Sequence, residues 1–161
     1  MSTQASIKLI PRTPAVEAYV RLLRAHSAIT RRLNSKLVAD HGLTLNDYEV
    51  LMHLFRAEGQ RLRRVDLAEQ VILTPSGITR LLEGLERCGL VERASCASDA
   101  RVTYAQLTEQ GEAKLHEASQ THVEDVHGLF GDRFSAKEIT TLHELLERLP
   151  ADGVDESECL E

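Results

Sequence analysis

The chain has 161 residues, of which 42% are apolar, 27% are charged and 4% are aromatic, and it contains no tryptophan. This length suits one compact domain, or one lobe with a dimerisation element, built around Leu, Val, Ile and Ala. No apolar run approaches the roughly 20 residues that cross a bilayer. The N-terminal stretch MSTQASIKLIPRTP also lacks the apolar segment and cleavage site of a signal peptide. We therefore expect a cytoplasmic protein.

The net charge of −6 is unevenly distributed along the chain. Residues 56–108 carry eight arginines and seven acidic residues, whereas the part after Thr108 carries 14 acidic and four basic residues. A mildly basic middle is compatible with local contact to a nucleic acid, because steering depends on the local field. The three cysteines contain no CxxC pair, which argues against a disulfide framework and a zinc knuckle.

The first half of the chain predicts two helices after a flexible arm of 13 residues. From Pro14 a long helix is indicated by apolar residues at helical spacing, and Gly42 would end it. The apolar positions are Val16, Tyr19, Val20, Leu23, Ile29, Leu33 and Leu37. Thr44, with Asp47 three residues later, would cap a second helix. Its expected buried stripe is Tyr48, Leu51, Leu54 and Phe55.

Two further helices are expected before the pattern changes. The stretch RRVDLAEQVIL predicts a short one, and TPSGITRLLEGLER predicts another that Thr74 caps, with Pro75 in the first position and Gly89 as terminator. One face of this fourth helix is apolar, and it includes Ile78, Leu81, Leu82, Leu85 and Cys88, all expected to be buried. The opposite face has no apolar residue and carries Ser76, Thr79, Arg80, Glu83 and Arg87.

After Gly89 the sequence predicts a β-hairpin, because LVERAS and VTYAQLT are rich in strand formers and flank a polar loop. Thr108 would cap a fifth helix, with Leu115, Ala118, His122, Val126 and Leu129 on one side. Ser135 and Glu138 form a capping box for a sixth helix that Pro150 ends. Its apolar stripe is Ile139, Leu142, Leu145 and Leu149.

This order of elements is that of a winged helix-turn-helix. In such a domain the second helix lies in the major groove of DNA, and the hairpin reaches the neighbouring minor groove. Arg101 suits the negative potential of the minor groove, and Asp99 would fix its side chain through a charge-assisted hydrogen bond. The predicted DNA-binding residues are Arg63, Arg64, Thr74, Ser76, Thr79, Arg80, Asp99 and Arg101.

The segment from Leu73 to Gly111 resembles the winged-helix core of the MarR family of bacterial transcriptional regulators. The family's wing pattern, Asp-x-Arg and then Leu-Thr-x-x-Gly, is matched by Asp99, Arg101, Leu107, Thr108 and Gly111. Its recognition-helix pattern is matched by Ser76, Thr79, Arg80, Leu81, Leu85, Gly89, Leu90, Val91 and Arg93. The wing has fewer basic residues than is usual, which predicts a shallower salt dependence or a lower affinity.

The resemblance implies a mainly α fold with a small β-hairpin, in which a winged helix-turn-helix domain is joined to a helical dimerisation lobe. The expected parts are a flexible arm (1–13), a dimerisation helix (14–43), the winged domain (44–108), dimerisation helices (109–150) and an acidic tail (151–161). It further implies an obligate homodimer that binds an inverted repeat in double-stranded DNA and acts as a repressor. A small aromatic carboxylate or phenolic ligand would release the DNA.

Four residues are candidates for holding that ligand: Arg21, Arg24, His26 and His53. An Arg and a His at opposite ends of a flat molecule would fix a carboxylate and a hydroxyl. The alternative is that the arginines are solvated and His26 is a core residue. We predict no metal site and no cofactor: Asp40–His41 and His116–Glu117 offer donors, yet the chain has no His-x-x-x-His pair.

Two other functions stay open. Cys96 in the wing lies near Arg93 and Arg101, and such cations lower the pKa of a thiol, so a redox-responsive regulator is one alternative. A winged-helix module used for protein contact is the other. An enzyme is not expected, because the chain lacks a phosphate-binding glycine loop, a Gly-x-Ser-x-Gly elbow and a metalloprotease motif.

Overall fold

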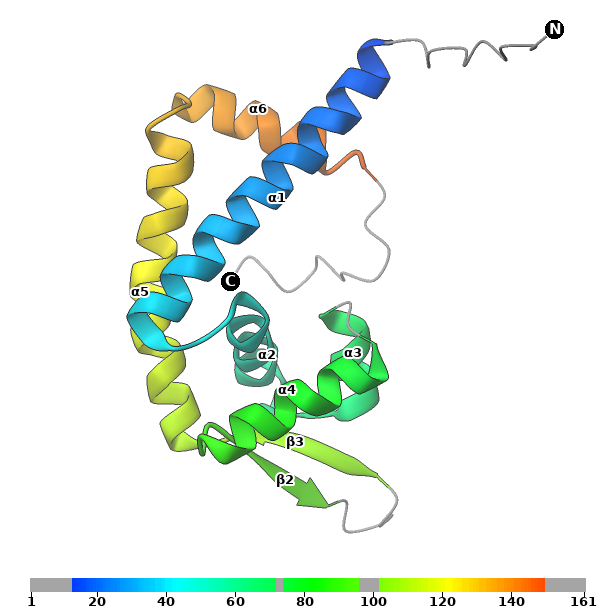
Figure 1. Ribbon diagram of the computed structural model, residues 1–161, viewed down its shortest axis with the longest axis vertical. Coiled ribbons are helices and arrows are strands. Elements are labelled where there is room, and N and C mark those ends of the chain that lie inside the picture. Colours follow the sequence, from blue (N-terminus) through cyan, green and yellow to red (C-terminus); the bar gives the residue numbers. More distant parts are fainter. Residues whose placement is uncertain (1–12, 72–73, 96–101, 150–161) are drawn as a thin grey trace, which may run out of the picture. The chain divides into compact units, whose positions relative to one another are not determined.

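The computed structural model describes residues 13–71, 74–95 and 102–149 (Figure 1). In chain order its elements are α1 (Pro14–His41), α2 (Leu45–Arg56), the 3₁₀ turn η1 (Glu58–Gln60), β1 (Arg61–Arg63), α3 (Arg64–Gln70), α4 (Pro75–Arg87), β2 (Val91–Ser95), β3 (Thr103–Leu107), α5 (Glu109–Gly131) and α6 (Ala136–Leu146). The chain divides after Arg32 into two compact units, and the core lies in the second. The expected fold class, mainly α with a small β element, is confirmed.

Local signals placed the starts of α2 and α6 and the end of α1 correctly, whereas α6 ends at Leu146, before the predicted stop at Pro150. The Thr44 Oγ1 atom accepts a hydrogen bond from the Asp47 N–H at 3.1 Å, and the Asp47 carboxylate accepts one from the Thr44 N–H at 2.8 Å. The same reciprocal box joins Ser135 and Glu138 at the start of α6. Gly42 follows α1 with a φ of 69°, a left-handed conformation that favours glycine.

The sheet has three strands where the sequence predicted two. Strand β3 lies between β1 and β2, and both pairs are antiparallel. The additional strand β1 pairs Arg61 with Gln106 and Arg63 with Tyr104. Three residues are too few to show an alternating pattern, so β1 exists because the edge of β3 offers it hydrogen-bond partners.

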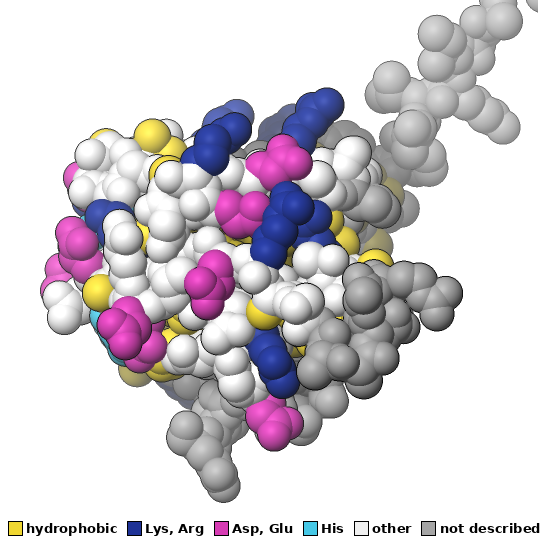
Figure 2. Space-filling model, turned by 90° about the horizontal axis from the view of Figure 1, so that it is seen from below, with side chains coloured by type: hydrophobic (Ala, Val, Ile, Leu, Met, Phe, Trp, Pro, Cys, Tyr) yellow, Lys and Arg dark blue, Asp and Glu magenta, His cyan; other side chains and the backbone are white. Residues whose placement is uncertain are grey.

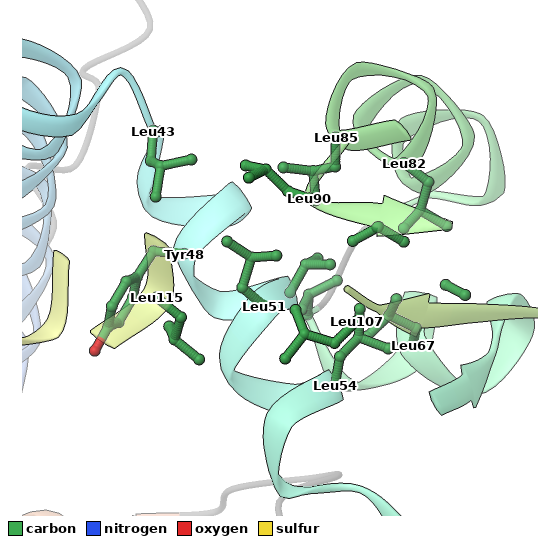
Figure 3. Close-up of a cluster of buried hydrophobic side chains, with 14 of the residues drawn as sticks. Leu43, Tyr48, Leu51, Leu54, Leu67, Leu82, Leu85, Leu90, Leu107 and Leu115 are labelled. Atoms are coloured by element: carbon green, nitrogen blue, oxygen red, sulfur yellow. The ribbon is translucent and has the colours of Figure 1, made fainter. Parts of the chain in front are cut away.

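The core surrounds α2, as Figure 3 shows. Side chains from α3, α4, β3 and α5 converge on this helix and are almost fully buried. Those labelled in the view include Leu67, Leu82, Leu85, Leu107 and Leu115, which surround Leu51 and Leu54 of α2. Of the stripe expected on α2, only Phe55 is partly exposed. This core holds α4 by its apolar face and therefore decides which of its faces points outward.

Other apolar side chains are exposed in the single chain. On α1 they include Val16, Tyr19, Val20, Leu22 and Leu23. On α6 they include Leu145, which is 51% exposed, Leu146 and the following Leu149, and α6 has no buried residue. None of the described helices is both long and apolar enough to span a membrane.

The expectation that Cys88 is buried is wrong, because its side chain is exposed. At 3.6 residues per turn, Cys88 lies at the rim of the α4 face that Ile78, Leu82 and Leu85 occupy. It is also the C-cap of the helix, one residue beyond the last turn. Helical spacing alone assigned Cys88 to the apolar face, whereas Leu85 is the last residue of α4 that is buried.

Gly111 in the first turn of α5 lies against the backbone that leads into β2. A Cβ atom at Gly111 would lie 2.0 Å from the Leu90 carbonyl oxygen and 2.8 Å from a Leu107 methyl carbon. The Leu90 carbonyl is itself held by the Thr108 N–H at 3.2 Å, so it has little freedom to move. The position requires glycine because of this close approach.

We predict that Gly111→Ala lowers the free energy of unfolding by about 1–3 kcal/mol, the usual cost of forcing extra volume into a packed site. Urea denaturation followed by circular dichroism measures this change. Gly131→Ala, in the last turn of the same helix, is the matched control because no atom lies within 4 Å of its Cβ position. Equal denaturation midpoints for the two variants would contradict the close approach.

Candidate nucleic-acid interface

Helix α4 begins with a well-formed cap. The Thr74 Oγ1 atom accepts a hydrogen bond from the Gly77 N–H at 3.1 Å and lies 3.3 Å from the Ser76 hydroxyl. The cap fixes where the helix begins, and the buried Ile78, Leu82 and Leu85 decide which of its faces points outward. Its N-terminal turn therefore has a defined direction, as a recognition helix needs.

The polar face predicted for α4 points outward. Ser76, Arg80, Glu83 and Arg87 are exposed, and Thr79 is partly exposed. No ion pair joins Arg80 or Arg87 to another residue in the three described ranges. Their guanidinium groups thus keep their donors for an external acceptor.

Arginines also gather at β1 and the start of α3. Two nitrogens of Arg63 donate to the two carboxylate oxygens of Asp66, at 2.6 and 2.8 Å. This hydrogen bonding, together with the negative charge of Asp66, raises the pKa of Arg63. Arg63 therefore carries an exposed positive charge whose position is fixed by Asp66. The neighbouring Arg61 lies over an aromatic ring, with its guanidinium carbon 5.3 Å from the centre of the Tyr104 ring.

Arg64 differs from its neighbour because its side chain is only 23% exposed. Its Nη2 atom lies 3.5 Å from Glu86 Oε1. Glu86 also accepts hydrogen bonds from Arg93 Nε, at 3.1 Å to one carboxylate oxygen and 3.0 Å to the other. The sequence did not point to Glu86. Arg93, in the Gly-Leu-Val-x-Arg pattern, was the one available hint, because it is a cation on a strand and the sequence assigned it no acidic partner.

The surface seen from below the sheet carries charges of both signs. Figure 2 shows dark blue basic side chains interspersed with magenta acidic ones on this face. A surface of this kind does not attract polyanions uniformly, so affinity for DNA would depend on where the individual arginines lie. Three predicted wing residues, Cys96, Asp99 and Arg101, lie outside the described residues.

The candidate ligand residues fall in both compact units. Arg21, Arg24 and His26 are exposed on α1 before the division, whereas His53 is partly buried on α2. Partial burial lowers the pKa of His53 below its usual value, and the charge of Arg56 lowers it further. A neutral imidazole at neutral pH suits a hydroxyl partner better than a carboxylate. The grouping of these four residues stays a prediction.

Two of the residues considered as metal donors, His41 and Glu117, lie close together within one chain. His41 Nδ1 lies 3.4 Å from Glu117 Oε1, and His41 Nε2 lies 2.6 Å from the Thr121 hydroxyl. His116 instead lies 3.7 Å from Glu112 and packs edge-on against Phe55. Within the described ranges, no three His, Cys, Asp or Glu side chains are grouped to hold a metal ion.

Comparison with known proteins agrees with this geometry. A model of the MarR family matches residues 43–103. The homoprotocatechuate degradative operon repressor of Escherichia coli is 31% identical over 134 residues, which cover 83% of this chain and 88% of the repressor. The chain belongs to the MarR family of transcriptional regulators.

Solved structures of the family have the same fold. AbsC, a MarR family regulator from Streptomyces coelicolor, is 31% identical and superposes with a TM-score of 0.76, covering 87% of this chain and 93% of AbsC. Sco3205, from the same organism and solved in complex with DNA, is 28% identical with a TM-score of 0.76, covering 86% of this chain and 88% of Sco3205. The winged helix-turn-helix interpretation is thereby confirmed.

Proposed function

We propose that this MarR-family protein is a homodimeric transcriptional repressor that binds an inverted-repeat operator through α4 and the wing. By wing we mean β2, β3 and the segment that joins them. The observation that carries the proposal is the outward face of α4, which is polar, exposed and anchored by the buried face behind it. The complex of the related Sco3205 with DNA supports it.

The proposed contacts follow from the chemistry of each side chain. Arg80 suits a guanine edge in the major groove, where a guanidinium donates to O6 and N7. Ser76 and Thr79 suit phosphates or base edges, and Thr74 adds its hydroxyl beside the helix N-terminus, where the macrodipole favours anions. Arg63 and Arg64 are proposed phosphate contacts.

For the wing, Arg101 is the proposed minor-groove contact and Asp99 is proposed to orient it. These two residues place a cation at one flank of each half-site. Contacts of this kind position the domain on the duplex and add little sequence information.

The dimer proposal rests on the uncovered apolar side chains of α1 and α6. A monomer that left these stripes in water would forgo the hydrophobic stabilisation of their burial, about 25 cal/mol for each Å². Two copies that cover the stripes also present two recognition helices, as two half-sites one turn of DNA apart require. We propose that residues 14–43 and 109–150 form the dimerisation lobe.

The proposed signal is a small aromatic carboxylate or phenol bound by Arg21, Arg24, His26 and His53. The Escherichia coli relative is the repressor of a homoprotocatechuate degradative operon. Oxidation of Cys96 remains the alternative signal.

We predict that the protein retards its own upstream DNA in an electrophoretic shift assay and that Arg80→Ala weakens this binding about tenfold or more, in line with the worth of one bidentate base contact. Lys137→Ala removes the same charge from α6 and should leave binding unchanged. Absence of a shift for the wild type at low salt would favour the protein-contact module.

We predict that sedimentation equilibrium gives twice the chain mass of 18.0 kDa. Leu145→Asp should shift the protein towards monomers and weaken DNA binding, because the charge would be buried between copies. Thr140→Asp, on the opposite side of α6, is the control. A monomeric wild type that still binds the operator would refute the dimer.

We predict that an aromatic carboxylate such as salicylate raises the melting temperature of the wild type and releases DNA, since a ligand that binds the folded state stabilises it. The shift should be lost in Arg24→Ala and in His53→Ala but kept in Arg133→Ala. Release of DNA by peroxide alone, abolished in Cys96→Ser, would favour the redox alternative.

A further inference from the structure

One carboxylate connects three parts of the winged domain. Glu86 lies in the last turn of α4. Its oxygens accept hydrogen bonds from Arg93 on β2, at 3.0 and 3.1 Å, and one of them lies 3.5 Å from Arg64 at the start of α3. The Glu86 side chain is 20% exposed and that of Arg64 is 23% exposed, so both are largely shielded from water.

The contacts of Glu86 supply a directional constraint that the apolar core lacks. The core holds α4 through Leu82 and Leu85, yet hydrophobic contact is non-directional and allows small rotations and shifts of a helix. Charge-assisted hydrogen bonds are directional and fix geometry more tightly. Glu86 meets α3 on one side and the first strand of the wing on the other.

We propose that Glu86 is a positioning residue for DNA binding. It holds α4 and β2 at the relative angle at which Arg80 and the wing reach neighbouring grooves of the same duplex. Its negative charge also lies 3.5 Å from the buried Nη2 atom of Arg64 and attracts this guanidinium group towards α4. This inference rests on the proposed operator binding and adds a residue that does not itself touch DNA.

The sign of its charge makes the role testable. An acidic residue in a DNA-binding domain opposes phosphate contact, so removing its charge should by electrostatics alone strengthen non-specific binding. If Glu86 positions the domain, removing the charge should instead weaken specific binding. The ratio of specific to non-specific affinity therefore separates the two effects.

The control is a carboxylate that lies away from the outward face of α4. Glu58, in the turn η1, is exposed, and no ion pair joins it to another described residue. Glu58→Gln and Glu86→Gln change the net charge of the protein equally. Only Glu86→Gln removes a carboxylate that connects other elements.

The experiment measures fluorescence anisotropy of the full-length protein with its upstream DNA and with a scrambled duplex of equal length. We expect Glu86→Gln to lower the ratio of specific to non-specific affinity about tenfold, comparable to the loss of one base contact. Glu58→Gln should leave this ratio within about twofold of the wild-type value, a change well below that of a lost base contact. The melting temperature of each variant is measured in parallel.

A double-mutant cycle distinguishes the positioning role from a simple folding defect. Arg93→Gln removes the same hydrogen bonds from the other side, so its effect on the ratio should not add to that of Glu86→Gln. Additive effects, or a ratio for Glu86→Gln equal to that of Glu58→Gln, would overturn the positioning role alone. A wild type that binds neither duplex would overturn the proposed function as well.

Discussion

The burial of one face of α4 is the constraint on which the rest of the winged domain depends. Ile78, Leu82 and Leu85 pack against the core around α2, and the Thr74 cap fixes where the helix begins. Because a helix has only one rotation that buries this stripe, its polar residues must face outward. The outward face of α4 is thus a consequence of core packing.

Thr108 and Gly111 perform a similar task at the junction between the wing and α5. The Thr108 hydroxyl donates to the Gly89 carbonyl at 2.7 Å and accepts from the Gly111 N–H at 3.0 Å. One side chain therefore caps α5 and holds the backbone that follows α4. The absence of a Cβ atom at Gly111 lets Leu90 approach this turn. These contacts give a physical reason for the Leu-Thr-x-x-Gly pattern: the wing and the long helix are built on a shared set of hydrogen bonds.

Several arginines of the winged domain form ion pairs with acidic residues of the protein itself. Asp66 holds Arg63, and Glu86 lies between Arg64 and Arg93. Such pairing reduces the net field, which fits the near balance of charges in residues 56–108. It also orders side chains before DNA arrives, so less conformational entropy is lost on binding.

The sequence by itself determined the helices, their caps and the outward face of α4, because these depend on residues a few positions apart. The boxes at Thr44 and Ser135 and the stops at Gly42 and Gly89 were readable for this reason. Only the tertiary structure decided the strand β1, the exposure of Cys88 and the bridge at Glu86. Each of these depends on a neighbour distant in the chain: the edge of β3, the end of the core, and two arginines on other elements. Local patterns specify how a segment folds, whereas long-range packing selects which of its side chains meet.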